Sequence, residues 1–267
     1  MKKRRISLII LLLLLSVLCL VSIGMAWKEY ADRGKDRHAF EELAQMVELP
    51  EETTVPATEN TAPDDTEKIP DETIAAETEP EPVEQKRNLA PSMEQNSECI
   101  GWICIEGTVV DYPVMHTPND PQKYLRKNFE GVYSVSGVPF LDYRCNLDST
   151  NLILYGHNMK NGTMFSAVTG YAKESYWKEH PTIELETADD CKTYAVFAAV
   201  SVKKTDGWYA FITAESEEAF QDAVSAIRAK ARYSTGIVPE YGKQLLTLST
   251  CYGSSKDDRL IVIAVEI

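Results

Sequence analysis

The chain has 267 residues and a formal net charge of −14, from 27 basic and 41 acidic residues. This balance excludes a general nucleic-acid-binding protein, which needs a basic face. A hydrophobic fraction of 44% is ordinary for a folded domain, and six cysteines in this length are too few for a disulfide scaffold. The acidity is concentrated in one stretch, because residues 51–85 hold 12 acidic residues and one basic residue.

The N-terminus predicts a membrane anchor. Residues 1–5 carry four basic side chains, and residues 6–26 carry no charge. About twenty helical residues span about 30 Å, which is the thickness of the hydrocarbon core of a bilayer. We expect a cytoplasmic tail at 1–5, a single transmembrane helix at 6–26, and the rest of the chain outside the membrane. A cleaved signal peptide is the alternative, although its apolar region is usually shorter.

Residues 27–87 predict a helix followed by a stalk. Four apolar residues recur with helical spacing and indicate a short amphipathic helix within 28–48: Phe40, Leu43, Met46 and Val47. Residues 49–85 contain six prolines among Glu, Asp and Thr, and no aromatic residue. Such a segment cannot bury enough apolar surface to fold, so we expect a disordered stalk, with an acidic partner-binding tail as the alternative.

Residues 88–267 predict one folded domain, which we expect to fold without the anchor and the stalk. A helix is expected after Thr213, with Ser216 as its cap and an apolar stripe that consists of Phe220, Ala223, Val224, Ile227 and Ala231. Seven runs rich in Val, Ile, Tyr and Leu predict strands at 101–105, 109–114, 151–155, 182–186, 193–202, 244–249 and 260–266. The pattern favours a mainly β fold, a closed or nearly closed β-barrel with helical insertions.

Three side chains at the ends of these strands have the chemistry of a thiol-dependent site. His157 follows the strand at 151–155, Cys251 follows the strand at 244–249, and Arg259 opens the last strand. A thiol is a weak nucleophile at neutral pH, and a nearby imidazole or guanidinium favours the reactive thiolate. The Arg fork also suits a developing oxyanion. In the alternative interpretation, Cys251 is a small core residue and Arg259 pairs with Asp257 or Asp258 at the surface.

Four motifs occur in one order along residues 88–267. They are Gly101–Thr108 with Asp111–Val114, Tyr124-Leu125 with Gly137–Asp142, Tyr155-Gly-His157-Asn-Met159, and Thr247-Leu-Ser-Thr-Cys251 followed by Arg259. Together they resemble the sortases, the cysteine transpeptidases of Gram-positive surfaces. The Leu-Ser-Thr-Cys sequence, the N-terminal helical extension and the helix after Thr213 make the chain most similar to class B.

The resemblance implies a fold and a set of site residues. It implies an eight-stranded sortase-type β-barrel with helical insertions, with Cys251 as nucleophile, His157 as general acid and base, and Arg259 as oxyanion stabiliser. By analogy with class B, Ser249 and Leu125 line the groove for the sorting peptide. The loop between Cys251 and Arg259 departs from some class B members, because it is short and carries Lys256-Asp257-Asp258.

The leading hypothesis for the function is a membrane-anchored cysteine transpeptidase on a Gram-positive type of surface. Such an enzyme cleaves a C-terminal sorting motif of a secreted protein, forms a thioester on its cysteine, and transfers the acyl group to an amine of a cell-wall precursor or a pilin lysine. A cysteine endopeptidase with water as acceptor, and a non-enzymatic cell-surface module, are the alternatives.

Cofactor and disulfide chemistry are predicted separately. We expect no metal and no other cofactor, because the sequence has no CxxC and no HExxH pattern. Besides Cys251, four cysteines would lie outside the membrane without a pairing that the sequence can determine: Cys99, Cys104, Cys145 and Cys191.

Overall fold

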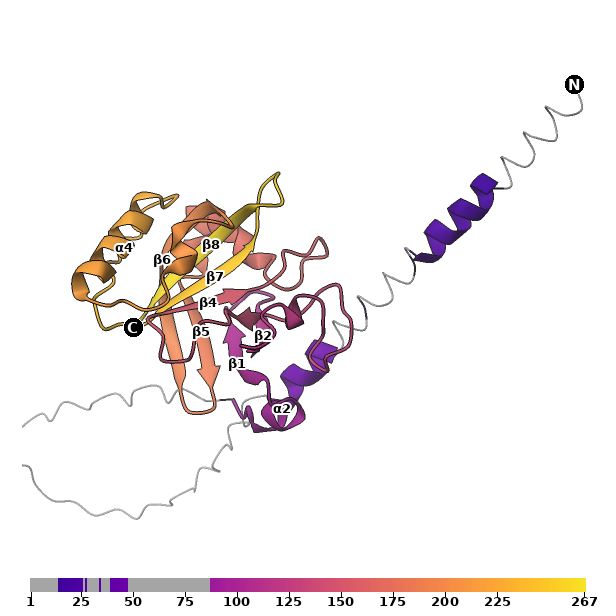
Figure 1. Cartoon of the computed structure of the whole chain (residues 1–267), viewed down its shortest axis with the longest axis horizontal. Coiled ribbons are helices and arrows are strands. Elements are labelled where there is room, and N and C mark those ends of the chain that lie inside the picture. The colour runs from indigo at the N-terminus through magenta and orange to yellow at the C-terminus, as the bar shows by residue number, and fades with distance from the viewer. Residues whose placement is uncertain (1–13, 26, 28–33, 35–38, 48–86) are drawn as a thin grey trace, which may run out of the picture.

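The computed structural model describes residues 14–25, 27, 34, 39–47 and 87–267 (Figure 1). The predicted stalk and cytoplasmic tail lie outside these residues, as does part of the predicted span at 6–26. The described part of that span, 14–25, is helical. Within the described residues, none of the helices combines the length and hydrophobicity that crossing a bilayer requires, so the transmembrane helix stays a prediction.

Eight strands form a closed barrel, in the order β1-β2-β3-β4-β7-β8-β6-β5, and β5 pairs with β1 to close it. The strands are β1 (Cys99–Cys104), β2 (Asp111–Met115), β3 (Phe140–Leu141), β4 (Asn151–Tyr155), β5 (Thr182–Thr187), β6 (Cys191–Lys203), β7 (Leu245–Cys251) and β8 (Asp258–Glu266). This confirms the predicted eight-stranded barrel. The seven predicted strands are present with ends shifted by a few residues, and β3 was missed because two residues carry no detectable alternation.

The centre of the barrel is apolar on both sides of β7. The first six residues of β7 are buried because β4 and β8 flank the strand and η3 (Gly207–Ala210) lies against it. Thr247 is the polar residue at the middle of this strand, and it is fully buried. Its hydroxyl accepts a hydrogen bond from Trp208 Nε1 at 3.0 Å and donates one to Asn151 Oδ1 at 2.8 Å. Satisfying this hydroxyl avoids the cost of a buried unpaired polar group.

The helices cover the outside of the barrel. The helix expected after Thr213 is α4 (Glu217–Ala229), and Ser216 caps it by accepting a hydrogen bond from the Ala219 amide at 3.1 Å. Phe220, Val224 and Ile227 are buried, whereas Ala231 lies beyond the last helical residue, which corrects the predicted stripe. Two six-residue helices, α2 (Ala90–Gln95) and α3 (Glu174–Glu179), were not predicted, because such short helices show little periodicity. Two further 3-10 helices are η1 (Lys123–Leu125) and η2 (Ala167–Ala172).

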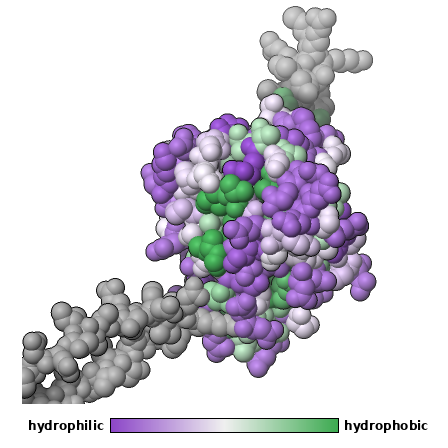
Figure 2. All heavy atoms as spheres, turned by 90° about the vertical axis from the view of Figure 1, so that its left-hand side faces the viewer, coloured by the Kyte–Doolittle hydropathy of each residue, from purple (hydrophilic) through white to green (hydrophobic). Residues whose placement is uncertain are grey.

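Hydrophilic side chains cover most of the face seen at the left of Figure 1. Hydrophobic side chains on that face gather mainly in one small area (Figure 2). One small apolar area of this kind is ordinary on the surface of a folded domain and carries no functional meaning by itself.

A helix at 39–46 packs on the barrel beside α2 and β2 (Figure 1). Phe40, Leu43 and Val47 are buried, and the Phe40 ring meets Tyr112 of β2 edge to face with centroids 5.4 Å apart. Met46 is 47% exposed, so its predicted place in the apolar stripe is wrong. The position of Met46 around the helix points it away from the barrel, while Val47, one residue later, reaches the core.

Arg87 attaches the start of the folded domain close to the same place. Its guanidinium donates to Asp111 Oδ1 of β2 at 2.5 Å, and its backbone amide donates to Glu186 Oε1 of β5 at 2.7 Å. Helix 39–46 and Arg87 therefore contact the same part of the barrel, although 39 residues of chain, 48–86, separate them.

Replacing Phe40 with Ala tests whether helix 39–46 belongs to the folded body. We expect Phe40→Ala in the full chain to lower the free energy of unfolding by about 3 kcal/mol, because it removes a buried aromatic ring. Met46→Ala on the same helix is the matched control and should cost no more than about 0.5 kcal/mol. Urea unfolding measures both values, and equal effects of the two substitutions would contradict the packing of this helix.

Candidate active site

The strand register brings the three predicted residues to neighbouring positions. β4 and β7 are parallel, with Tyr155 opposite Ser249. His157 and Cys251 each lie two residues further along the chain from this pair. β7 and β8 are antiparallel, with Cys251 directly opposite Arg259. The residues predicted as nucleophile, acid–base group and oxyanion stabiliser therefore lie at one end of three adjacent strands.

Cys251 is the last residue of β7, and its side chain is exposed. The chain then turns through Gly253, which has a φ of 114°. Two hydrogen bonds join this strand end to the histidine segment: Asn158 Nδ2 donates to the Cys251 carbonyl at 3.0 Å, and Thr250 Oγ1 donates to the Gly156 carbonyl at 2.8 Å. The thiol thus sits at an accessible position on a backbone that is held on both sides.

Gly156, directly before His157, is required by close packing. A Cβ at this residue would lie 2.5 Å from the ring of Phe165, which is fully buried. Phe165 also donates its amide to the His157 carbonyl at 2.9 Å, so the loop after His157 folds back against it. Close packing against the Phe165 ring therefore excludes any side chain at residue 156, directly before His157.

A backbone carbonyl contacts the His157 ring. Its Nε2 lies 2.9 Å from the backbone carbonyl of Leu125 in η1. A carbonyl oxygen only accepts, so Nε2 carries the hydrogen and the neutral ring leaves Nδ1 as the acceptor. Burial lowers the pKa of His157, the Leu125 carbonyl opposes this effect, and the positive charges of Arg126 and Arg259 lower the pKa further. The ring is thus biased toward its neutral, proton-accepting form.

Backbone carbonyls hold the Arg259 side chain. Its Nη1 donates to the Lys256 carbonyl at 2.8 Å and to the Asp258 carbonyl at 2.9 Å. The two neighbouring carboxylates pair with lysines that follow or end β6: Asp258 with Lys203, and Asp257 with Lys204 at 2.8 Å. The alternative in which Arg259 pairs with Asp257 or Asp258 is therefore wrong. Within the described residues, the hydrogen bonds of the guanidinium use one nitrogen, Nη1, and leave Nη2 and Nε for another ligand.

A buried polar network lies beneath the site. Ser249 is 2% exposed, and its hydroxyl is 2.8 Å from the Tyr209 hydroxyl. Tyr209 stacks on Tyr155 with ring centroids 6.1 Å apart, and the Tyr155 hydroxyl donates to Asp142 Oδ2 at 2.8 Å. Arg144 closes the network, donating to Asp142 Oδ2 at 2.7 Å and to the Tyr209 carbonyl at 2.7 Å.

This network was not predicted from the sequence, although Asp142 and Tyr155 lie inside the quoted motifs. Burial of Asp142 favours its neutral form, but hydrogen bonds from Arg144 and Tyr155 outweigh that effect and keep its pKa below the ordinary value. The network joins β4 and β7 through η3 and supports the ends of these two strands from below. Ser249, predicted to line the peptide groove, belongs to this buried network in the structure. Leu125, the second predicted groove residue, is partly buried and presents its carbonyl to His157.

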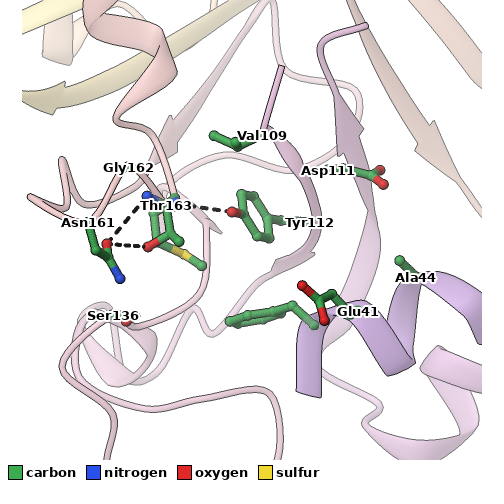
Figure 3. Close-up of a pocket in the computed structure, with 11 residues that line it drawn as sticks. Glu41, Ala44, Val109, Asp111, Tyr112, Ser136, Asn161, Gly162 and Thr163 are labelled. Atoms are coloured by element: carbon green, nitrogen blue, oxygen red, sulfur yellow. Dashed lines mark hydrogen bonds between the residues drawn. The ribbon is translucent and has the colours of Figure 1, made fainter. Parts of the chain in front are cut away.

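A cavity of about 590 Å³ lies beside the loop that follows His157. Helix 39–46 forms one wall with Glu41 and Ala44, and Asn161, Gly162 and Thr163 form the facing wall (Figure 3). The Met164 amide donates to the Tyr112 hydroxyl at 3.1 Å, which fixes this loop to β2. Helix 39–46 thus forms part of a cavity next to the histidine segment.

The chain is similar to known sortases. The sortase domain of the family model matches residues 103–267. The curated Sortase B of Staphylococcus aureus is 29% identical over 186 residues, which cover 68% of this chain and 75% of that protein. A solved S. aureus sortase B–substrate complex is 27% identical, covers 67% of this chain and 84% of the solved chain, and has a TM-score of 0.63. A solved sortase B complexed with triglycine is 27% identical, covers 67% of this chain and 85% of the solved chain, and has a TM-score of 0.62.

Differences in cysteine burial predict a selective chemical reaction. The described cysteines form no disulfide; Cys251 is exposed, whereas Cys99 and Cys145 are buried. Burial raises the pKa of both buried thiols, that of Cys145 to about 11. We expect iodoacetamide to modify Cys251 at neutral pH long before Cys99 or Cys145, because the thiolate is the reactive species. Peptide mass mapping reads the result, with Cys251→Ala as control; equal modification of the three thiols would contradict this assignment.

Proposed function

Because the chain belongs to the sortase family of cysteine transpeptidases and is most similar to its class B, we propose that Cys251, His157 and Arg259 carry out its reaction. The substrate in this proposal is a C-terminal sorting motif of a secreted protein, and the acceptor is an amine of a cell-wall precursor or a pilin lysine. The observation that carries the proposal is the register of β4, β7 and β8, which gathers a thiol, an imidazole and a guanidinium at one strand end.

The first half of the reaction forms a thioester. The Cys251 sulfur attacks the scissile carbonyl carbon, and its proton passes to Nδ1 of His157, the nitrogen that the Leu125 contact leaves free. The carbonyl oxygen becomes an oxyanion in the tetrahedral intermediate. When the C–N bond breaks, His157 returns a proton to the leaving amine, which departs neutral, and the acyl group stays on sulfur.

The second half transfers the acyl group. An acceptor amine attacks the thioester carbonyl, His157 takes a proton from the nitrogen, and the C–S bond breaks as the new amide forms. The sulfur leaves as a thiolate and is reprotonated by His157, which restores the starting state. If water takes the place of the amine, the same steps give a carboxylic acid, which is the endopeptidase alternative.

Arg259 is proposed to stabilise the oxyanion of both intermediates. Its Nη1 is fixed by two backbone carbonyls, so the guanidinium is oriented before substrate binds. Preorganised donors of this kind need no reorganisation when charge develops. The neighbouring aspartates pair with Lys203 and Lys204, which reduces their competition for the guanidinium.

The N-terminal sequence supports a location at the cell membrane. In this proposal residues 6–26 cross the bilayer with residues 1–5 in the cytoplasm, and residues 27–87 hold the catalytic domain on the outer side. Four basic residues before an uncharged apolar run support this orientation. Leu125, which is partly buried and contacts His157 through its backbone carbonyl, is the better placed of the two proposed groove residues, because the Ser249 hydroxyl is buried against Tyr209.

Product analysis separates transpeptidation from hydrolysis. The full chain is incubated with a library of C-terminal sorting peptides, with and without triglycine, an amine chosen because a solved sortase B is complexed with it. We expect a new peptide–triglycine amide that depends on both triglycine and Cys251, and its absence in Cys251→Ala. Formation of the carboxylic acid alone, at a rate unchanged by triglycine, would favour the endopeptidase.

Arg259→Lys tests the oxyanion role. Lys keeps the charge but offers a point charge in place of the planar fork, so we expect kcat to fall by about 10²-fold while KM changes little. Lys256→Ala is a matched control, because Arg259 contacts only the backbone carbonyl of that residue and the substitution keeps it. Turnover of Arg259→Lys near that of the wild-type chain would remove Arg259 from the catalytic set.

A further inference from the structure

The carbonyl that orients His157 belongs to a short element that cannot hold its own position. Leu125 is the last residue of η1, a single 3-10 turn of three residues without a side-chain cap. A turn of this length is not stable alone, because nucleating a helix costs more than one hydrogen bond returns. The position of the Leu125 carbonyl must therefore come from contacts with the rest of the domain.

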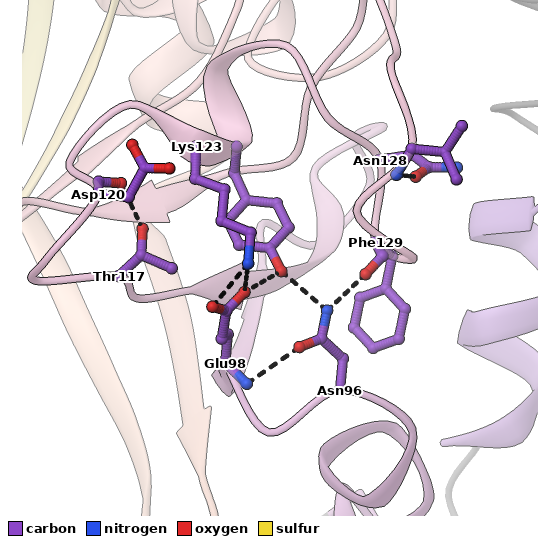
Figure 4. A network of polar contacts seen from close by, with 9 residues as sticks. Asn96, Glu98, Thr117, Asp120, Lys123, Asn128 and Phe129 are labelled. Atoms are coloured by element: carbon purple, nitrogen blue, oxygen red, sulfur yellow. Dashed lines mark hydrogen bonds and ion pairs between the residues drawn. The ribbon is translucent and has the colours of Figure 1, made fainter.

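A cluster of polar side chains supplies these contacts on one side of η1. Both carboxylate oxygens of Glu98 accept from Lys123 Nζ, at 2.7 and 2.6 Å, and Oε2 also accepts from the Tyr124 hydroxyl at 2.5 Å (Figure 4). Asn96 Nδ2 donates to the same Tyr124 oxygen at 2.9 Å. The Tyr124 side chain is 1% exposed. These four residues, Asn96, Glu98, Lys123 and Tyr124, are called the Glu98 clamp below.

The Glu98 clamp is attached to the barrel. Glu98 directly precedes β1, and its backbone carbonyl accepts from the His116 amide, just after β2, at 2.8 Å. The hydrogen bonds from Lys123 and Tyr124 lower the pKa of Glu98, so its carboxylate is ionised at neutral pH. Charge-assisted hydrogen bonds are the stronger kind, and here they tie two consecutive residues of η1 to the first strand.

Gly137 confines η1 from the other side. Its φ is 63°, and a Cβ at this residue would lie 2.5 Å from the Tyr124 carbonyl oxygen and 2.9 Å from the Leu125 carbonyl oxygen. Both contacts are with backbone, so no flexible side chain could move aside. The adjacent Val138 amide donates to the Tyr124 carbonyl at 3.1 Å. Any side chain at residue 137 would therefore displace the carbonyl that His157 contacts.

We propose that the Glu98 clamp and Gly137 set the orientation and tautomer of His157 by fixing the Leu125 carbonyl, which makes Glu98 a positioning residue for the reaction. This inference rests on the proposed function, in which His157 exchanges protons with Cys251 and the leaving amine. Glu98 does not touch the imidazole itself. Its carboxylate holds Lys123 and Tyr124, and the carbonyl of Leu125, the residue after Tyr124, contacts the ring.

The consequence for the ring has a definite sign. Without the Leu125 carbonyl, the neutral ring gains access to the Nδ1–H tautomer, in which Nδ1 no longer accepts a proton. The carbonyl contact also stabilises the imidazolium, so its loss lowers the pKa of His157 further. The charged groups that face the ring are Arg126 and Arg259, and those that face Glu98 are Lys123 and Lys127, with the Tyr124 hydroxyl.

Two glycine substitutions provide a matched test in the full chain. Gly137→Ala and Gly131→Ala both place a Cβ at positive φ, 63° and 79°, but nothing lies within 4 Å of the Cβ at residue 131. Both variants therefore carry similar backbone strain, and only Gly137→Ala presses on η1. Nitrogen NMR of labelled histidine reports the tautomer and pKa, and His157→Ala assigns the signal among the four histidines.

In Gly137→Ala we expect an Nδ1–H population, a lower His157 pKa, and a fall in kcat of about ten- to a hundredfold with a small change in KM. In Gly131→Ala all four quantities should match the wild-type chain. A wild-type tautomer and pKa in folded Gly137→Ala overturn the proposal, whatever the rate.

Milder variants keep the proposal testable if Gly137→Ala does not fold. Tyr124→Phe removes the hydroxyl between Glu98 and Asn96, and Glu98→Gln keeps one acceptor oxygen that Glu98→Ala removes. We expect the shift in His157 pKa to be larger in Glu98→Ala than in Glu98→Gln; equal, wild-type values in all three variants overturn the proposal. Full activity of His157→Ala would instead overturn the proposed function, and the NMR signals would still decide the role of the Glu98 clamp.

Discussion

The parallel pairing of β4 with β7 is the constraint on which the site depends. Tyr155 lies opposite Ser249 in this pair, and each of the two proposed catalytic residues, His157 and Cys251, follows two positions further along its chain segment. Because side chains alternate between the two faces of a sheet, a slip of one residue would move either His157 or Cys251 to the opposite face. The antiparallel pairing of β7 with β8 applies the same constraint to Arg259. Closure of the barrel leaves these strands without a free edge at which the register could slip.

Buried polar groups make this register specific. Thr247 contacts Asn151 across the β4–β7 pair, and Ser249 contacts Tyr209, whose carbonyl accepts from Arg144. In a low-dielectric interior each of these groups costs free energy when it has no hydrogen-bond partner. An alternative register would leave several of them without partners at once. Apolar packing alone would specify the register less strictly. Residues on both faces of β7 are buried, and one Leu of this strand could occupy the place of another.

Charge is organised differently at the site than in the chain as a whole. The chain is strongly acidic, yet the groups that influence His157 are the cations Arg126 and Arg259. Asp257 and Asp258, which follow Cys251, are paired with Lys204 and Lys203 at the end of β6, and Glu98 is paired with Lys123. Because the nearby carboxylates are paired with lysines, the charges closest to His157 are positive. The acidic residues farther away contribute little to the electrostatics of the site, because salt screens interactions between distant charges.

The sequence by itself determined the kind of domain, seven of its eight strands, the cap of α4 and the three candidate residues, because these features are written in local patterns of apolar residues, turns and short motifs. Only the tertiary structure decided the contacts between distant segments: Arg144 with Tyr209, Tyr155 with Asp142 and Tyr209, the packing of helix 39–46 through Phe40, and the contact of Leu125 with His157. It also showed that Met46 faces away from the barrel and that Ser249 is buried. The physical reason is that a hydrogen-bond partner 32 residues away leaves no periodic signal in either segment, since its position follows from how the whole barrel closes.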